Sequence, residues 1–326
     1  MLSTCGVGTI VAMTDEPSAS GPTRLDWWQL PEPVRSLIEA RVGAPVVSAV
    51  TPPGGFSHGL AARLTLADGG RVFAKVIAAD DGLARAYRIE ARCAAQLPAQ
   101  VPAPRLRFTL DGDGWVALAF DDVDGRHPDL ADPTELAAVL RLVQELSSAL
   151  TPNPVADAPS IADAFGGKFN VWRRYLGQGP PADLDGWSRR HLAELAALED
   201  QWAAATRGNT LLHLDLRPDN LLTMASGAVV AVDWSWPAVG ASWVDLVALM
   251  PAALAAGVDP DPILADHPLT VDVAPNEVDA FICALAGYWT FHCRQPPPAR
   301  APTLRSYQAA NAERTTRWLA SRTGWV

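Results

Sequence analysis

Residues 211–222 read LLHLDLRPDNLL, which sets five charged, imidazole or amide side chains between two pairs of leucines. Leucine is among the residues most often buried, so the two pairs predict short strand pieces in a protein core. Such pieces would hold both ends of the segment and fix the polar side chains in place. A fixed set of polar groups is typical of a catalytic or binding site.

The polar residues of this segment have the spacing H-x-D-x-x-x-x-N from His213 to Asn220. Phosphoryl transfer to an alcohol needs a carboxylate that accepts the hydroxyl proton, and Asp215 would supply it. It also needs oxygen ligands for Mg²⁺, and the Asn220 amide would supply one. The alternative is structural, with Asp215 capping a turn and Asn220 lying within it.

Two further aspartates follow the segment. Asp233 ends the apolar run VVAVDW thirteen residues after Asn220, where it could be a second Mg²⁺ ligand or a common strand-end aspartate. Asp245 lies near the start of an expected helix. It could interact with the helix dipole, or it could support the loop by accepting hydrogen bonds from the backbone of residues 213–215, His213 included.

Lysine is rare in this chain, since Lys75 and Lys168 are the only two among 26 basic residues. Lys75 lies in the expected strand RVFAKVIA, where a compact ammonium suits phosphate oxygens better than a guanidinium. Glu90, on the following helix, is the only acidic residue between Gly82 and Asp111, so we expect it to pair with Lys75.

A glycine-rich turn, PPGGFSHG at residues 52–59, precedes this strand. Gly55, Ser57 and backbone N–H groups could cover the phosphates of a nucleotide. The turn lacks spaced glycines, so an ordinary hairpin is the alternative.

The order of expected elements predicts an α+β fold with two lobes. Residues 24–120 read as strand, strand, strand, helix, strand, strand, and form the expected nucleotide-binding lobe. Residues 121–126 would form a hinge, and residues 127–326 a mainly helical lobe with the catalytic loop. In that lobe we expect Thr134 to cap a helix. Further helices are expected at 163–177, 184–205, 242–257, 275–293 and 303–321.

Composition excludes several classes of protein. Hydrophobic residues make up 49% of the 326 residues, and charged residues 19%, which is enough apolar surface for a large core. The net charge of −10 argues against a nucleic-acid partner. All of it lies in residues 121–126 and the helical lobe, which together have 25 acidic and 15 basic residues, against 11 of each in residues 1–120.

The chain shows no signal peptide or apolar run of transmembrane length, so no membrane is expected. Its four scattered cysteines are typical of reduced thiols in a cytoplasmic protein. Residues 1–23 read as a disordered tail, within which translation could start at Met1 or Met13. The sequence makes no prediction of oligomeric state.

Together these residues resemble the aminoglycoside phosphotransferase and choline kinase-like family, small-molecule kinases with a protein-kinase-like fold. The resemblance runs from about Val46 to Leu249. It implies that Lys75 and Glu90 contact a nucleotide, that Asn220 and Asp233 bind Mg²⁺, and that the backbone from Phe120 to Val123, with Asp122, holds adenine. ATP is the implied donor, with GTP open.

Two positions depart from the family pattern. The glycine turn has Ser-His at residues 57 and 58, where many members have Ser-Asn, and the loop reads LRPDN, which is closer to a protein kinase. A protein kinase is nevertheless disfavoured. Only 12 residues lead from Asp233 to Asp245, which is too short for a peptide-docking activation segment.

The expected partner is a hydroxylated small molecule. The acidic second part of the chain favours a cationic acceptor such as an aminoglycoside or another antibiotic, in a resistance-type reaction. Tryptophans there would equally suit stacking on a sugar, nucleoside or macrolide. A metabolic kinase for a sugar or amino alcohol is the first alternative, and a non-catalytic nucleotide-binding regulator the second.

Overall fold

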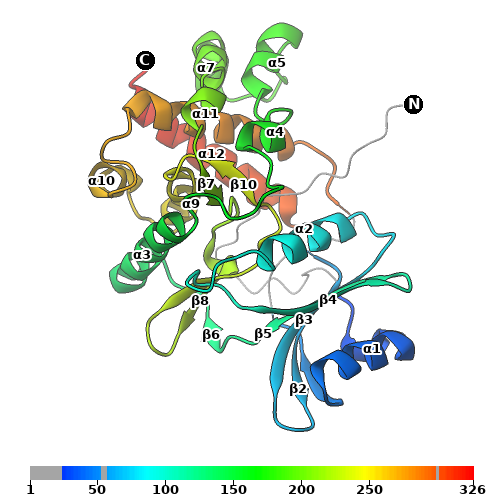
Figure 1. The fold of residues 1–326 in the computed structure, drawn as a ribbon. Helices are drawn as coiled ribbons and strands as arrows, with labels where there is room; N and C mark the ends of the chain where they lie inside the picture. Colours follow the sequence, from blue (N-terminus) through cyan, green and yellow to red (C-terminus); the bar gives the residue numbers. More distant parts are fainter. Residues whose placement is uncertain (1–23, 53–56, 299–300) are drawn as a thin grey trace.

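The computed structural model describes residues 24–52, 57–298 and 301–326, and these form a sheet-rich half and a helical half (Figure 1). The expected tail at residues 1–23 and the glycine-turn residue Gly55 lie outside the described residues. None of the described helices is long and apolar enough to cross a membrane.

The first half is built on one antiparallel five-stranded sheet. Its strand order is β1-β2-β3-β5-β4, so β3 lies in the centre. The strands are β1 (Val46–Val50), β2 (Leu60–Leu66), β3 (Arg71–Ala78), β4 (Leu106–Gly112) and β5 (Trp115–Asp121). Two helices cover the sheet, α1 (Glu32–Val42) below it and α2 (Ala84–Ala94) above it in the view of Figure 1, and the 3-10 turn η1 (Trp27–Gln29) precedes α1.

Side-chain alternation along β3 explains which residues face which helix. Successive side chains of a strand point to opposite faces. Val72, Ala74 and Val76 pack in the cluster that contains α1, whereas Ile77 packs in the cluster that contains α2. Lys75 therefore lies on the α2 face of the sheet.

The second half is mainly helical. Its helices are α3 (Pro133–Ala149), α4 (Ile161–Phe165), α5 (Val171–Gln178), α6 (Gly186–Arg190), α7 (Leu192–Glu199), α8 (Trp202–Ala205), α9 (Val244–Ala255), α10 (Pro260–Asp266), α11 (Pro275–His292) and α12 (Leu304–Thr323). Most of α11 is buried, which fits its apolar sequence on all sides. It packs against α5, α7, α8, α9 and α12 and forms the centre of this half.

The expected helix boundaries were wrong in three places. Asp132, not Thr134, caps α3, because its Oδ1 accepts hydrogen bonds from the N–H groups of Thr134 (2.8 Å) and Glu135 (3.1 Å). The helix expected at 163–177 is two helices, α4 and α5, with Gly166 and Gly167 after the first. The single helix expected at 184–205 is three helices, α6, α7 and α8. Helix α10 was not predicted from the sequence.

Short strands hold the segment at residues 211–222. β7 (Thr210–Leu212) pairs with β10 (Ala238–Gly240), and β8 (Leu221–Met224) lies between β6 (Gly125–Arg126) and β9 (Val229–Ala231). The loop between β7 and β8 includes the 3-10 turn η2 (Pro218–Asn220). β6 was missed because its two residues lie in a segment rich in turn formers.

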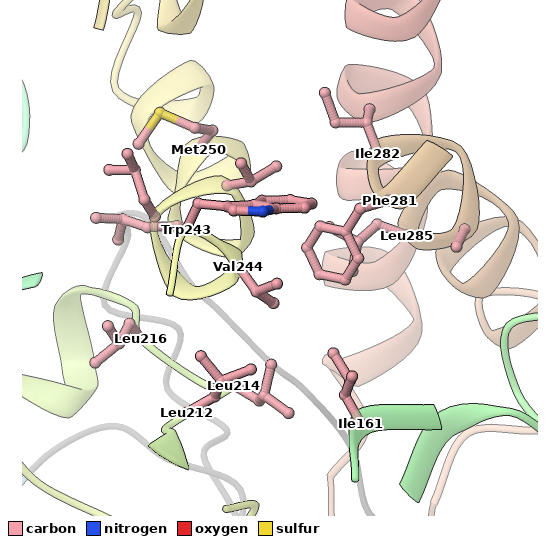
Figure 2. Close-up of a cluster of buried hydrophobic side chains, with 14 of the residues drawn as sticks. Ile161, Leu212, Leu214, Leu216, Trp243, Val244, Met250, Phe281, Ile282 and Leu285 are labelled. Carbon is pink, nitrogen blue, oxygen red and sulfur yellow. The ribbon is translucent and has the colours of Figure 1, made fainter. Parts of the chain in front are cut away.

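Five of the six leucines of this segment belong to the core of the helical half, whereas Leu222 is only half-buried. Leu212, Leu214 and Leu216 are all buried, with Trp243 and Val244 of the α9 end above them and Phe281 and Leu285 of α11 beside them (Figure 2). This packing fixes the backbone from which the polar side chains project.

Candidate active site

Lys75 and Glu90 form a buried ion pair between the sheet and α2. Glu90 lies on the buried face of α2, which meets the face of the sheet that carries Lys75. Lys75 Nζ is 2.5 Å from Glu90 Oε2, and the two residues are 7% and 2% exposed. Because a buried charge needs a partner, this pair defines where the ammonium lies.

Lys75 also contacts Asp233, which comes from the helical half. Nζ lies 3.1 Å from Asp233 Oδ1, and the Ser235 hydroxyl donates to the same oxygen at 2.5 Å. Burial alone would lower the pKa of Lys75, but Asp233 and Glu90 raise it above its usual value. Burial would likewise raise the pKa of Asp233, but Lys75 and Ser235 hold it well below its usual range. Both groups are therefore charged at neutral pH.

Asp215 and Asn220 lie side by side in the loop. Asn220 Nδ2 donates to Asp215 Oδ2 and to the Asp215 carbonyl oxygen, both at 2.9 Å. Arg217 Nε lies 3.3 Å from Asp215 Oδ1, and Arg217 Nη2 lies 3.2 Å from Asp219 Oδ2. Both oxygens of the Asp215 carboxylate thus have a fixed direction.

Asp245 supports the start of the loop. Its Oδ2 and Oδ1 accept hydrogen bonds from the N–H groups of His213 (2.7 Å) and Leu214 (2.8 Å). Burial raises the pKa of Asp245 to about 6, although these two bonds favour the ionised form. Asp245 lies in the first turn of α9, so the loop is tied to the core of the helical half.

His213 is a fully buried neutral imidazole. Its Nε2 lies 2.9 Å from the Val232 carbonyl oxygen and donates to it, and its Nδ1 accepts from the Asp215 N–H at 3.2 Å. Burial lowers the pKa of His213 to about 4. A proton on Nδ1 would break the bond to Asp215, so the loop geometry needs the neutral ring.

Two residues of the site have left-handed backbone conformations. The φ angles are 59° at Leu214 and 66° at Asp233, in a region that costs a residue with a side chain about 1–2 kcal/mol. Asp245 stabilises the first conformation. Near the second, the Val232 N–H donates to the Asn220 carbonyl oxygen at 2.9 Å, which brings Asp233 next to the loop.

The residues after the glycine turn are linked to Lys75 through Tyr87. Ser57 Oγ lies 2.8 Å from Tyr87 Oη, and Lys75 Nζ lies 5.2 Å from the centroid of the Tyr87 ring. A Cβ at Gly59 would lie 2.6 Å from Tyr87 Oη, so only glycine allows this close approach. Tyr87 is 2% exposed and connects the turn to the ammonium.

Two other contacts hold the base of the same turn. Arg24 donates to the carbonyl oxygens of Pro52 (3.1 Å) and Ser57 (3.3 Å), on either side of the turn. His58 Nε2 lies 2.6 Å from Asp81 Oδ2. The histidine that departs from the family pattern therefore joins the turn to the corner before α2.

The expected hinge residues have structural contacts of their own. Phe120 is 7% exposed and packs in the cluster that contains α2. The Asp122 carboxylate pairs with Arg71 (2.5 Å) and Arg63 (3.3 Å), and Arg63 Nη2 donates to the Val123 carbonyl oxygen at 2.7 Å. The Phe120 and Asp122 side chains are therefore engaged within the sheet half, and their contact with a nucleotide stays a prediction.

The donor set for Mg²⁺ is small. No group of three or more His, Cys, Asp or Glu in the described part of the chain is arranged to hold a metal ion. Asn220 Oδ1 and Asp233 Oδ2 accept no hydrogen bond from other described residues, since the bonds of these side chains involve Nδ2 and Oδ1. Mg²⁺ is commonly bound through one or two protein oxygens, phosphates and water, so this pair fits it.

Sequence reasoning missed Arg217 and Tyr87. Arg217 is in the motif itself, and an arginine between two aspartates was a usable signal. Tyr87 was visible only as part of the apolar face of its helix. Nothing in the sequence indicated that its hydroxyl meets Ser57.

A model of the phosphotransferase enzyme family matches residues 50–269, which include every residue of the site except Arg24. The chain belongs to this family. No curated protein matches the sequence of this phosphotransferase.

Solved structures confirm the expected two-lobed, α+β, protein-kinase-like fold. Choline kinase LicA from Streptococcus pneumoniae is similar with a TM-score of 0.61 and 13% identity, over 89% of this chain and 100% of that one. A thermostable mutant of aminoglycoside phosphotransferase APH(4)-Ia, in a ternary complex with ADP and hygromycin B, has a TM-score of 0.58 and 15% identity, over 89% and 98%. An aminoglycoside phosphotransferase from Alicyclobacillus acidocaldarius is similar with a TM-score of 0.52 and 16% identity, over 86% of this chain and 92% of that one.

Proposed function

We propose that this phosphotransferase transfers the terminal phosphoryl group of ATP to a hydroxyl of a small molecule. The observation that carries the proposal is the Lys75–Asp233 contact of 3.1 Å. It joins the cation of the sheet half to the carboxylate that follows the loop. ADP and AMP in the complexes of two structural neighbours support an adenine nucleotide as donor.

Lys75 would bind phosphate oxygens of the nucleotide. Its ammonium has three N–H donors, of which Glu90 and Asp233 take two, and the third can reach a phosphate. Asn220 Oδ1 and Asp233 Oδ2 would hold Mg²⁺, which neutralises phosphate charge when bound. Because the ion pair with Glu90 fixes the position of the Lys75 ammonium, the phosphates would bind to a cation that is already in place.

Asp215 would orient the acceptor hydroxyl and accept its proton. Asn220 and Arg217 hold the two carboxylate oxygens, so the carboxylate needs little rearrangement when the acceptor binds. In a loose phosphoryl-transfer transition state, such positioning contributes more than base strength. The Arg217 charge also offsets the negative charges of Asp215 and Asp219.

We propose an antibiotic or another natural product as the acceptor. Hygromycin B in the complex of one structural neighbour supports this reading, and similarity to a choline kinase keeps a metabolic amino alcohol as the second candidate. Because ATP is the proposed donor, we place the reaction in the cytoplasm. The three described cysteines, Cys93, Cys283 and Cys293, are free thiols, which agrees with that compartment.

The test is ATP consumption by the purified protein across hydroxylated antibiotics, sugars and amino alcohols, with mass spectrometry of the products. Asp215→Asn should lower turnover by about 10²–10⁴-fold and leave ATP affinity within about twofold. Asp259→Asn is the matched control, because Asp259 is exposed and only caps α10. Nucleotide binding with no phosphorylated product would support the non-catalytic regulator. Lost ATP binding in Asp215→Asn would make Asp215 structural.

A further inference from the structure

Four side chains close a ring of contacts that includes the proposed Mg²⁺ ligand Asp233. Lys75 Nζ contacts Glu90 Oε2 at 2.5 Å and Asp233 Oδ1 at 3.1 Å. Ser235 Oγ lies 2.5 Å from the same Asp233 oxygen and 3.4 Å from the same Glu90 oxygen. One ammonium and one hydroxyl therefore bridge the same two carboxylates. Ser235 is the one member of this ring that has no role in the proposed function.

The Ser235 hydroxyl belongs to Asp233 rather than to Glu90. A serine has a single O–H group, so it donates to one of the two carboxylates at a time. The 2.5 Å bond to Asp233 has the length of a charge-assisted bond, whereas the 3.4 Å contact with Glu90 exceeds the usual range. Because Ser235 is buried, little water competes for the bond to Asp233.

The residue between Asp233 and Ser235 fixes the geometry of this bond. Trp234 is buried in the core of the helical half. Its ring packs edge-on against His213 of the loop, with centroids 4.6 Å apart. Because Trp234 is anchored in this way, the residues on either side of it keep a fixed separation, and the serine hydroxyl reaches back to the carboxylate.

The bonds to Asp233 occupy one carboxylate oxygen and leave the other. Oδ1 accepts from both Lys75 and Ser235, whereas Oδ2 accepts no hydrogen bond from any residue in the described part of the chain. The Asp233 side chain is 37% exposed, so a cation can approach the second oxygen. If Lys75 turns toward a phosphate, Ser235 still holds Oδ1. Asp233 therefore offers a metal ion one oxygen rather than two.

A carboxylate that offers one oxygen favours a small cation. Mg²⁺ needs near-octahedral geometry and keeps several waters, whereas Ca²⁺ takes about six to eight oxygens, commonly with bidentate carboxylates. We propose that Ser235 is a positioning residue that selects Mg²⁺ over Ca²⁺ by limiting Asp233 to coordination through one oxygen. The inference rests on the proposed function, in which Asn220 Oδ1 is the other protein ligand.

The test is calorimetry of AMP-PNP, a non-hydrolysable ATP analogue, on the full chain with Mg²⁺, with Ca²⁺ or with EDTA. Wild type should bind it most tightly with Mg²⁺. Ser235→Ala should weaken binding with Mg²⁺ by about tenfold, because Asp233 loses a hydrogen bond to a charged oxygen. Binding with Ca²⁺ should stay the same or become tighter, because the released Oδ1 can join its coordination. Binding with EDTA should not change.

Three further variants separate selection of the metal from a general loss of structure. Ser235→Thr keeps a hydroxyl and should keep the wild-type preference for Mg²⁺. Ser188→Ala should also keep it, and it is the matched control, because Ser188 is a buried serine of α6 in the helical half. If Ser235→Ala does not fold, Ser235→Cys replaces it, and its weak donor should lower the same preference to a smaller degree.

Three results would overturn the proposal. Wild type binds AMP-PNP equally well with the two cations; folded Ser235→Ala, or Ser235→Cys in its place, keeps the wild-type preference; or that variant weakens binding equally in all three conditions, which would make Ser235 a structural residue only. Phosphorylation of any hydroxylated acceptor alongside these results would leave the proposed function standing. A wild type that binds no AMP-PNP in any condition would remove both.

Discussion

Replacing Tyr87 with phenylalanine removes one oxygen atom from the link between the glycine turn and Lys75. The lost contact is the 2.8 Å hydrogen bond between Tyr87 Oη and Ser57 Oγ. The ring, with its centroid 5.2 Å from Lys75 Nζ, remains. The Lys75–Glu90 pair does not involve the hydroxyl, so this variant releases Ser57 without moving the ammonium.

The expected size of the effect follows from that single bond. A neutral hydrogen bond contributes about 0.5–1.5 kcal/mol, and 1.4 kcal/mol corresponds to about tenfold in an equilibrium constant. If Ser57 must be fixed in place for nucleotide to bind, KM for ATP should rise by roughly twofold to tenfold. Asp215 and Asn220 are unaffected, so kcat should change by less than about twofold.

The assay is steady-state turnover with ATP varied at saturating acceptor, together with the Kd of an ATP analogue. Tyr175→Phe is the matched control, since Tyr175 packs against Trp172 in the helical half. It should leave KM for ATP unchanged. A Tyr87→Phe variant with wild-type KM, or one that loses kcat at constant KM, would refute the assignment of Tyr87 to positioning the turn.

Other predictions concern the ammonium, the buried histidine and the close approach at β10. Lys75→Arg should raise the Kd for ATP by about tenfold and lower the free energy of unfolding by about 1–3 kcal/mol, because the larger guanidinium does not fit a site that is only 7% exposed. An ATP affinity equal to that of the wild type would contradict the need for an ammonium. Folding lowers the pKa of His213 from 6.5 to about 4, so this residue binds a proton more readily in the unfolded chain. The free energy of unfolding of the wild type should therefore fall by about 2 kcal/mol from pH 7 to pH 5, and the His213→Gln variant should lack this loss. Urea unfolding at the two pH values measures the difference, and equal pH slopes for the two proteins would count against it. Gly240→Ala should cost about 1–3 kcal/mol in urea unfolding, since its Cβ would lie 2.7 Å from Leu212 Cδ1; an unchanged midpoint would show that the site adapts.

The parts of the site that were predictable come from short-range patterns. Strand alternation assigns Lys75 a face of the sheet, and Glu90 is the only nearby acid on the next helix. The spacing from His213 to Asn220 lies within one loop, so the sequence distance itself limits the geometry. These arguments need no knowledge of how the halves meet.

The rest depends on contacts between distant residues. Arg71 and Arg63, which lie on two different strands, form ion pairs with the Asp122 carboxylate, and no local sequence pattern predicts these pairs. The residue that caps α3 could not be predicted, because the backbone angles decide whether the helix begins after Asp132 or two residues later.

The Lys75–Asp233 pair has a consequence for anyone who builds hybrids of related enzymes. Each partner is oriented by its own half, Lys75 by Glu90 and Asp233 by the turn at Ser235. A chimera that joins the sheet half of one family member to the helical half of another could keep every motif and still misplace this salt bridge by an ångström or two. Such hybrids should therefore be chosen by the fit of the crossing pair rather than by motif identity.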